Sequence, residues 1–204
     1  IGEIGMNFAL YGFGPQQNRE WLIVDVGVTF PDEKHPGVDL ILPDTRFIEG
    51  NIDNLRGIVI THVHEDHYGA LHDLWPRLKV PVWMTRFGAG LLEAKRQSEH
   101  GAPDIPVQIY AGGGKVPLGP FQIEAVPGAH TGDWRIDPAP QIGPETDQAR
   151  LRALGDAGVL ALICDSTNAL REGESPSEKA VGESLEKIIS EAAGRVAITT
   201  FSSN

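Results

Sequence analysis

Four side chains that commonly bind metal ions lie within six residues: His62, His64, Asp66 and His67. Alternate residues of an extended segment point to the same side, so His62 and His64 can bind one ion together. Asp66 and His67 are adjacent and can face a second ion. Imidazole and carboxylate ligands suit zinc, or a similar divalent ion such as manganese.

Two neighbouring ions would give this cluster a definite chemistry. They can share a hydroxide and hold a phosphate or carbonyl oxygen, which predicts metal-assisted hydrolysis. A simpler interpretation is a polar loop in which histidines gather by chance. The segment holds three of the seven histidines of the chain, and such clusters usually mark metal or catalytic sites, so the metal interpretation is favoured.

The elements on either side predict where the cluster lies in the fold. Residues 57–60 are Gly-Ile-Val-Ile, an apolar and β-branched run that is typical of a buried strand. Residues 69–78 place Leu71, Leu74 and Leu78 at helical spacing. The cluster therefore lies where a strand ends and a helix begins, which is a common place for a site in α/β proteins.

Two other segments offer side chains to the same site. Asp25 lies near the end of the apolar strand predicted over 21–27, and a buried carboxylate is costly unless it is paired. We interpret Asp25 as an acid that orients a ligand histidine from behind, with a turn cap as the alternative. His130 and Asp133 lie together in a glycine-containing turn and are candidate metal ligands, with a plain turn as the alternative.

The rest of the chain predicts strands and helices in one domain. Its 204 residues are enough for a full hydrophobic core, and no internal repeat or interdomain linker is visible. Strands are predicted over residues 8–12, 21–27, 57–60, 80–84, 159–165 and 195–201, with a hairpin over 116–127. Helices are predicted over residues 69–78, 86–100, 146–154 and 176–193, the last one capped by Ser175 or Ser177.

Composition narrows the class of protein. Apolar residues make up 41% and charged residues 22% of the chain, which is ordinary for a soluble globular protein. No apolar run is long enough for a membrane span, and no signal peptide is visible. The single Cys164 fits a reducing cytoplasm. The first residue is Ile1 rather than methionine, so we expect the sequence to begin inside a longer chain.

Several motifs occur in order along the chain: residues 2–7 (Gly-Glu-Ile-Gly-Met-Asn), 24–27 with 30–31, 36–44, 62–67, 130–134 (His-Thr-Gly-Asp-Trp), 165–168 (Asp-Ser-Thr-Asn) with 176–178, and 199–204. Together they resemble the ribonuclease J family, in the β-CASP branch of the metallo-β-lactamase superfamily. The resemblance implies the α/β class and an αββα sandwich, the metallo-β-lactamase fold, which is incomplete in this sequence. It implies a metallo-β-lactamase domain over residues 1–200, with residues 201–204 starting a β-CASP domain that lies beyond this sequence.

The resemblance also implies a role for each candidate residue. His62 and His64 would bind one zinc ion, Asp66 and His67 would bind the other and act in catalysis, Asp133 would bridge the two ions, and Asp25 would orient a ligand. The implied cofactors are two zinc ions, with manganese as an alternative. The implied activity is hydrolysis of RNA phosphodiester bonds, both from a 5′-monophosphate end and internally, in mRNA decay and rRNA maturation. The family further implies a cytoplasmic protein that forms a dimer or tetramer and has no membrane partner.

One feature departs from the family pattern. The family has a further histidine ligand in a His-Ser loop ahead of its His-Thr-Gly-Asp motif. Here Val126-Pro127 runs almost directly into His130, so that loop is missing. Either His130 replaces the missing ligand or the sequence omits a segment, and we expect weak or partial metal occupancy of the site as it stands.

Two other functions stay open on the sequence. The net charge of −11 argues against nonspecific nucleic-acid binding through a broad basic surface, although a nuclease can hold phosphates through metals and local Lys or Arg residues. This charge favours a small-molecule hydrolase of the same superfamily, acting on a thioester or a lactam. A noncatalytic RNA-binding scaffold is the other alternative, favoured if the ligand loop is absent.

Overall fold

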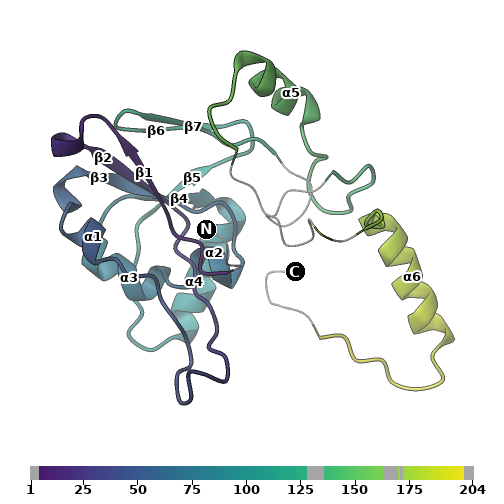
Figure 1. Cartoon of the computed structure of the whole chain (residues 1–204). Helices are drawn as coiled ribbons and strands as arrows, with labels where there is room; N and C mark the ends of the chain where they lie inside the picture. Colours follow the sequence, from purple (N-terminus) through teal and green to yellow (C-terminus); the bar gives the residue numbers. More distant parts are fainter. Residues whose placement is uncertain (1–4, 128–135, 163–169, 171, 200–204) are drawn as a thin grey trace. The chain divides into compact units, whose positions relative to one another are not determined.

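The computed structural model describes residues 5–127, 136–162, 170 and 172–199 (Figure 1). The chain divides into two compact units, Ile1–Ala125 and Val126–Asn204, and each is described by itself. None of the described helices is both long and apolar enough to cross a membrane. The candidate ligands His130 and Asp133, and residues 201–204 that would begin a β-CASP domain, lie outside the described residues.

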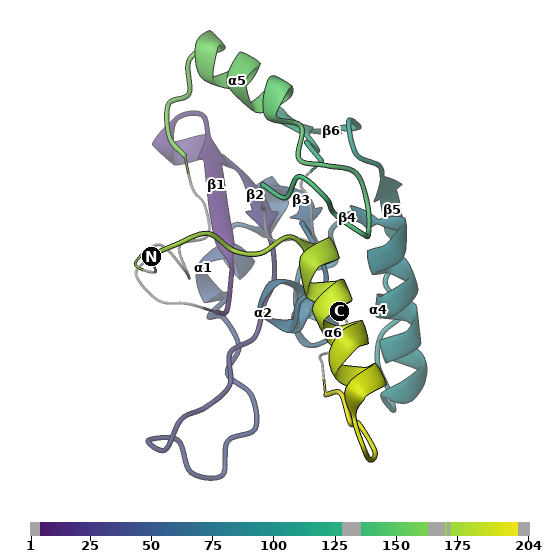
Figure 2. The ribbon, with the colours of Figure 1, turned by 90° about the vertical axis from the view of Figure 1, so that its right-hand side faces the viewer.

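The first unit is built on a five-stranded sheet in the order β1-β2-β3-β4-β5, which Figure 2 shows from left to right. The strands are β1 (Ala9–Phe13), β2 (Glu20–Val24), β3 (Leu55–Val59), β4 (Val82–Thr85) and β5 (Val107–Tyr110). The short 3-10 helix η1 (Gln16–Asn18) joins β1 to its antiparallel partner β2, whereas β2 to β5 run parallel. Parallel strands end at the same edge of a sheet, so residues that follow β2 and β3 come close together.

Helices cover one face of this sheet. They are α1 (Arg46–Glu49), α2 (Glu65–Tyr68), α3 (Leu71–Leu78) and α4 (Arg86–Ser98), with the 3-10 helix η2 (Ile52–Asn54) ahead of β3. The leucines of α3 that recur at helical spacing are buried in the same core as Ile23 and Ile58 of the sheet. At the start of α4, the Thr85 hydroxyl accepts a hydrogen bond from the Gly88 amide and caps the helix.

A hairpin of β6 (Lys115–Leu118) and β7 (Phe121–Glu124) packs on the opposite face, as predicted for residues 116–127. Val116 of the hairpin is buried with Leu22 and Val59, whereas their neighbours Ile23 and Ile58 point into the main core. Side chains alternate across a strand, so β2 and β3 are buried on both faces. This two-sided burial explains why their sequences are continuous apolar runs rather than alternating ones.

The second unit contains two described helices, α5 (Gln148–Ala157) and α6 (Glu178–Glu191), both of which were predicted. Each begins at a side-chain cap, because Asp147 accepts from the Arg150 amide and Ser177 accepts from the Ala180 amide. Of the two serines predicted to cap the last helix, Ser177 is therefore the cap.

The strands predicted over 159–165 and 195–201 are wrong for the described part of each segment. Residues 159–162 and 195–199 form no strand, and Leu160 and Ile198 are 105% and 64% exposed. An apolar, β-branched run forms a strand only where a neighbouring strand pairs with it, and the described residues supply no such partner here. Conversely, β5 was not predicted from the sequence.

Candidate metal centre

The histidine cluster lies at the carboxyl edge of the first unit's sheet. β3 ends at Val59, and the Ile60 amide donates to the Trp83 carbonyl, which keeps the chain extended beyond the strand. The chain stays extended to His64 (φ −75°, ψ 146°), and α2 begins at Glu65. The predicted strand-to-helix position of the cluster is therefore confirmed.

The structure brings three imidazole rings together at this edge. His62 Nε2 lies 3.1 Å from His64 Nδ1, so two ring nitrogens from alternate residues face each other. The ring centroids of His62 and His67 are 3.9 Å apart. His62 is 6% exposed and His67 is largely buried, so the rings are mostly shielded from bulk water.

Asp66 and His67 form a second pair beside the first. His67 Nε2 lies 3.5 Å from Asp66 Oδ2, although the two side chains leave adjacent residues of α2. The backbone around them is held tightly, because the Val26 amide donates to the His67 carbonyl and the Val28 amide donates to the Glu65 carbonyl. The segment after β2 therefore fixes α2, and with it both side chains.

Asp25 is buried and contacts one histidine of the cluster. Its Oδ2 lies 2.8 Å from His67 Nδ1, and its Oδ1 accepts from the Thr61 amide over 2.8 Å. The Thr61 hydroxyl lies within 3.0 Å of both carboxylate oxygens, so the buried charge is well satisfied. Asp25 has φ of 63°, a left-handed conformation that Asp adopts more readily than most residues, and it turns the chain away from β2.

The spacing of these donor atoms suits a divalent cation. Two ligand atoms at zinc-bond lengths and a tetrahedral angle lie about 3.3 Å apart. The His62–His64 pair is separated by 3.1 Å and the Asp66–His67 pair by 3.5 Å, which brackets that value. Within the described residues, no group of three or more His, Cys, Asp or Glu is arranged to hold a metal ion. The described part shows two pairs of candidate ligands, His62 with His64 and Asp66 with His67.

Tyr110 is a neighbour of the site that the sequence analysis missed. Its hydroxyl donates to the Ile60 carbonyl over 2.7 Å and reaches the Thr61 carbonyl at 3.2 Å, just before the first histidine. Burial, and secondarily the negative charge of Asp25, raise the pKa of Tyr110 to about 12. A lone tyrosine at the end of a short strand gives no local signal for this contact, because its partners lie about 50 residues away.

Replacing Tyr110 by phenylalanine is expected to lower the free energy of unfolding by about 1 kcal/mol at pH 7, the usual net value of one hydrogen bond. An unfolded tyrosine loses its proton near pH 10, whereas folded Tyr110 keeps it until about pH 12. The stabilisation is therefore complete below pH 10 and is lost as the pH rises towards 12. Urea unfolding between pH 7 and 11 measures it, with the exposed Tyr11→Phe as control. A constant difference between wild type and Tyr110→Phe over this range would contradict the assignment.

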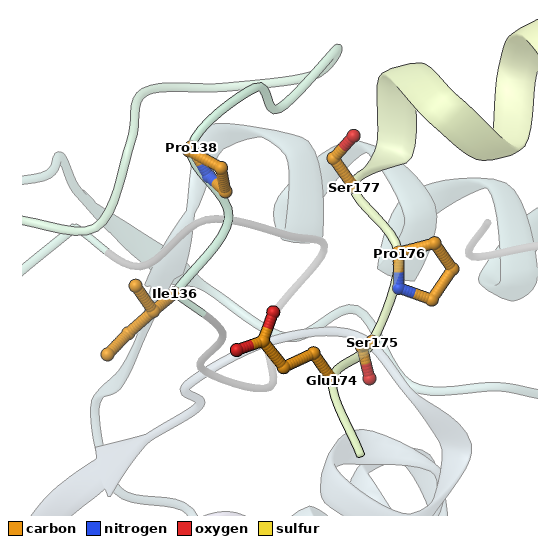
Figure 3. A pocket seen from close by; sticks show the side chains of 6 residues that line it. All are labelled: Ile136, Pro138, Glu174, Ser175, Pro176 and Ser177. Carbon is orange, nitrogen blue, oxygen red and sulfur yellow. The ribbon is translucent and has the colours of Figure 1, made fainter.

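A hollow in the second unit has fewer side chains that could bind a metal or act as an acid or base. Ile136 and Pro138 lie across from residues 174–177 around a space of about 770 Å³ (Figure 3). Glu174 is the one ionisable residue among its described lining residues. One carboxylate without a histidine, cysteine or second acid does not form a metal or acid–base site. The candidate site is therefore the histidine cluster at the carboxyl edge of the first unit's sheet.

Comparison with known proteins shows which superfamily the chain belongs to. The chain belongs to the metallo-beta-lactamase superfamily, whose sequence profile matches residues 15–138. The expected fold is therefore confirmed: a mixed α/β sheet with helices, present here as part of a domain. The superfamily also implies that the chain binds a divalent metal, which agrees with the donor atoms at the sheet edge.

Within this superfamily, the similarity is to ribonuclease J. The ribonuclease J of Sinorhizobium meliloti is 55% identical over 223 residues, covering 100% of this chain and 40% of the relative. The ribonuclease J of Mycolicibacterium smegmatis is 38% identical over 225 residues, covering 100% of this chain and 39% of the relative. The predicted resemblance is confirmed, and the chain spans about two-fifths of the length of the curated relatives it matches.

The lengths of these alignments bear on the missing loop. The match to the Sinorhizobium protein runs over 223 residues, whereas this chain has 204. The relative therefore has residues inside the matched region that this chain lacks. The alignment length does not locate these residues, so an absent segment ahead of His130 stays a prediction.

Proposed function

We propose that this chain is the metal-binding, N-terminal part of a ribonuclease that hydrolyses RNA phosphodiester bonds with divalent metal ions. The observation that carries the proposal is the 55% identity to a ribonuclease J along the whole chain. The two pairs of candidate ligands at the sheet edge support it, because their spacing suits the divalent cations that the proposed hydrolysis needs. We propose zinc as the native metal, with manganese as the alternative.

Each residue of the site has a proposed role. His62 and His64 would hold one cation, and Asp66 and His67 would hold the other, with Asp133 as a bridge and His130 as a further candidate. Divalent ions bound there would supply a hydroxide nucleophile near neutral pH and would offset charge on the phosphoryl group. Asp25 keeps the His67 proton on Nδ1, so Nε2 would be free of a proton and able to hold a cation. Thr61 in turn holds Asp25 through its amide and hydroxyl.

The wider properties of the enzyme are part of the same proposal. We propose a metallo-β-lactamase domain over residues 1–200 and a β-CASP domain that begins at residues 201–204. The substrate is RNA with a 5′ monophosphate, cut from that end and internally, in mRNA decay and rRNA maturation. The protein is proposed to be cytoplasmic and to form a dimer or tetramer.

A small-molecule hydrolase of the same superfamily is the second candidate. The net charge of −11 favours it, because RNA is a polyanion and a strongly acidic protein repels it at long range. The similarity to ribonuclease J over the whole chain disfavours it. A noncatalytic RNA-binding scaffold is the third candidate, and it is favoured only if the histidine ligand loop ahead of His130 is absent.

Direct assay separates these candidates. The natural protein, carrying all its domains, is expected to hydrolyse 5′-monophosphorylated RNA and to leave a thioester and a lactam intact. A chelator is expected to abolish hydrolysis, and added zinc or manganese is expected to restore it, because the proposed nucleophile depends on the metal. Turnover of the thioester without RNA cleavage would establish the second candidate, and RNA binding without cleavage would establish the third.

A further inference from the structure

Asn7 contacts both ligand atoms of the second pair. Its side-chain nitrogen Nδ2 lies 3.2 Å from Asp66 Oδ2 and 3.0 Å from His67 Nε2. The same nitrogen donates to the backbone carbonyl of Asp66 over 3.1 Å. The Asn7 amide therefore bridges the two atoms that would bind one cation.

Hydrogen-bond chemistry determines the direction of the contact with His67. Asp25 Oδ2 lies 2.8 Å from His67 Nδ1, and an ionised carboxylate can only accept, so Nδ1 carries the proton. In the neutral ring, Nε2 then has a lone pair and accepts from the Asn7 amide. A cation would bind the same lone pair of Nε2. The side-chain amide of Asn7 therefore occupies the position in which a bound cation would be stabilised.

The backbone of residues 5–7 holds this amide in place. Gly5 and Met6 have φ of 93° and 50°, and non-glycine residues such as Met6 rarely adopt the left-handed region. The backbone amide of Asn7 donates to the backbone carbonyl of Asp66 over 2.8 Å, and the backbone carbonyl of Asn7 accepts from the Gly27 amide over 2.9 Å. The contact of the side chain thus rests on a turn that is tied to both the sheet and α2.

We infer that Asn7 is a positioning residue for the Asp66–His67 pair, an inference that rests on the proposed function. Before a cation binds, the amide satisfies Asp66 Oδ2 and His67 Nε2 and keeps them directed at one point. With a cation on Nε2, Asn7 Nδ2 would still be placed to donate to Asp66 and to fix its carboxylate. Ligands that are already oriented lose less conformational freedom on binding, so the amide raises cation affinity.

The substitution Asn7→Ala, in the natural protein with all its domains, tests this role. The backbone amide of residue 7 still donates to the Asp66 carbonyl, so the variant removes the side-chain contacts alone. Titration with Co²⁺ reports affinity through visible absorption, and the shape of the band reports the ligand geometry. The expected result is a loss of about 10- to 100-fold in affinity for one ion, the usual effect of removing a group that orients a ligand.

Asn51→Ala is the matched control. Asn51 Nδ2 donates to the Phe47 carbonyl over 2.8 Å, so this variant also loses a side-chain amide bond to a backbone carbonyl, outside the cluster. It is expected to bind Co²⁺ as the wild type does. Equal losses in the two variants, or an unchanged or tighter affinity in Asn7→Ala, would overturn the role of Asn7. A wild-type protein that binds no Co²⁺ and cleaves no RNA would overturn the proposed function instead.

Discussion

Replacing His64 by alanine is expected to lower RNA hydrolysis by the natural protein about 10³-fold. His64 Nδ1 lies 3.1 Å from His62 Nε2, so the variant leaves one imidazole for a cation that two would hold. A catalytic cation contributes several kcal/mol to charge stabilisation in the transition state, and about 1.4 kcal/mol corresponds to a factor of ten. Single-turnover hydrolysis of 5′-monophosphorylated RNA at saturating protein measures the chemical step without product release.

His35→Ala is the matched control for this loss. His35 is exposed in a loop, where its Nδ1 contacts Asp32 Oδ1 at 2.8 Å. Its replacement removes the same kind of ring from the same chain and is expected to leave hydrolysis unchanged. If His64→Ala also cleaved RNA at the wild-type rate, the proposed role of His64 as a ligand of a catalytic cation would be excluded.

The histidine cluster could be predicted from sequence because its geometry is local. His62 and His64 are two residues apart on an extended segment, and the pleat alone brings their rings to one side. The burial of Asp25 could also be predicted, since an acid in an apolar strand needs a partner. Which histidine it contacts depends on the parallel pairing of β2 with β3, and a single sequence does not define that pairing.

The contacts of Asn7 and Tyr110 could not be predicted from local sequence patterns, because their partners are also distant in the chain. Asn7 lies 59 residues from Asp66, and its approach depends on a left-handed turn at Gly5 and Met6. Tyr110 reaches the Ile60 carbonyl only because β5 takes its place beside β4. Both residues act on the site through side-chain hydrogen bonds that no spacing rule along the chain encodes.

Gly27→Ala is expected to lower the free energy of unfolding by about 3 kcal/mol or more and to abolish cation binding. A Cβ atom at this position would overlap the backbone carbonyl of Asp66, and backbone atoms cannot rotate away as a side chain can. The Gly27 amide also donates to the Asn7 carbonyl over 2.9 Å. A shift of the segment after β2 would therefore move both Asn7 and Asp66. Urea unfolding and Co²⁺ titration of the natural protein measure the two effects.

Gly90→Ala separates this close approach from a general effect of replacing glycine. Gly90 lies within α4, and apart from its chain neighbours and the backbone of its own helix, no atom lies within 4 Å of a Cβ added there. Alanine favours a helix by about 1 kcal/mol over glycine, so this variant is expected to be slightly more stable and to bind Co²⁺ normally. Normal stability in Gly27→Ala would mean that the segment after β2 does not press against α2. The Asp66–His67 pair would then lack the rigid support on which its proposed cation affinity depends.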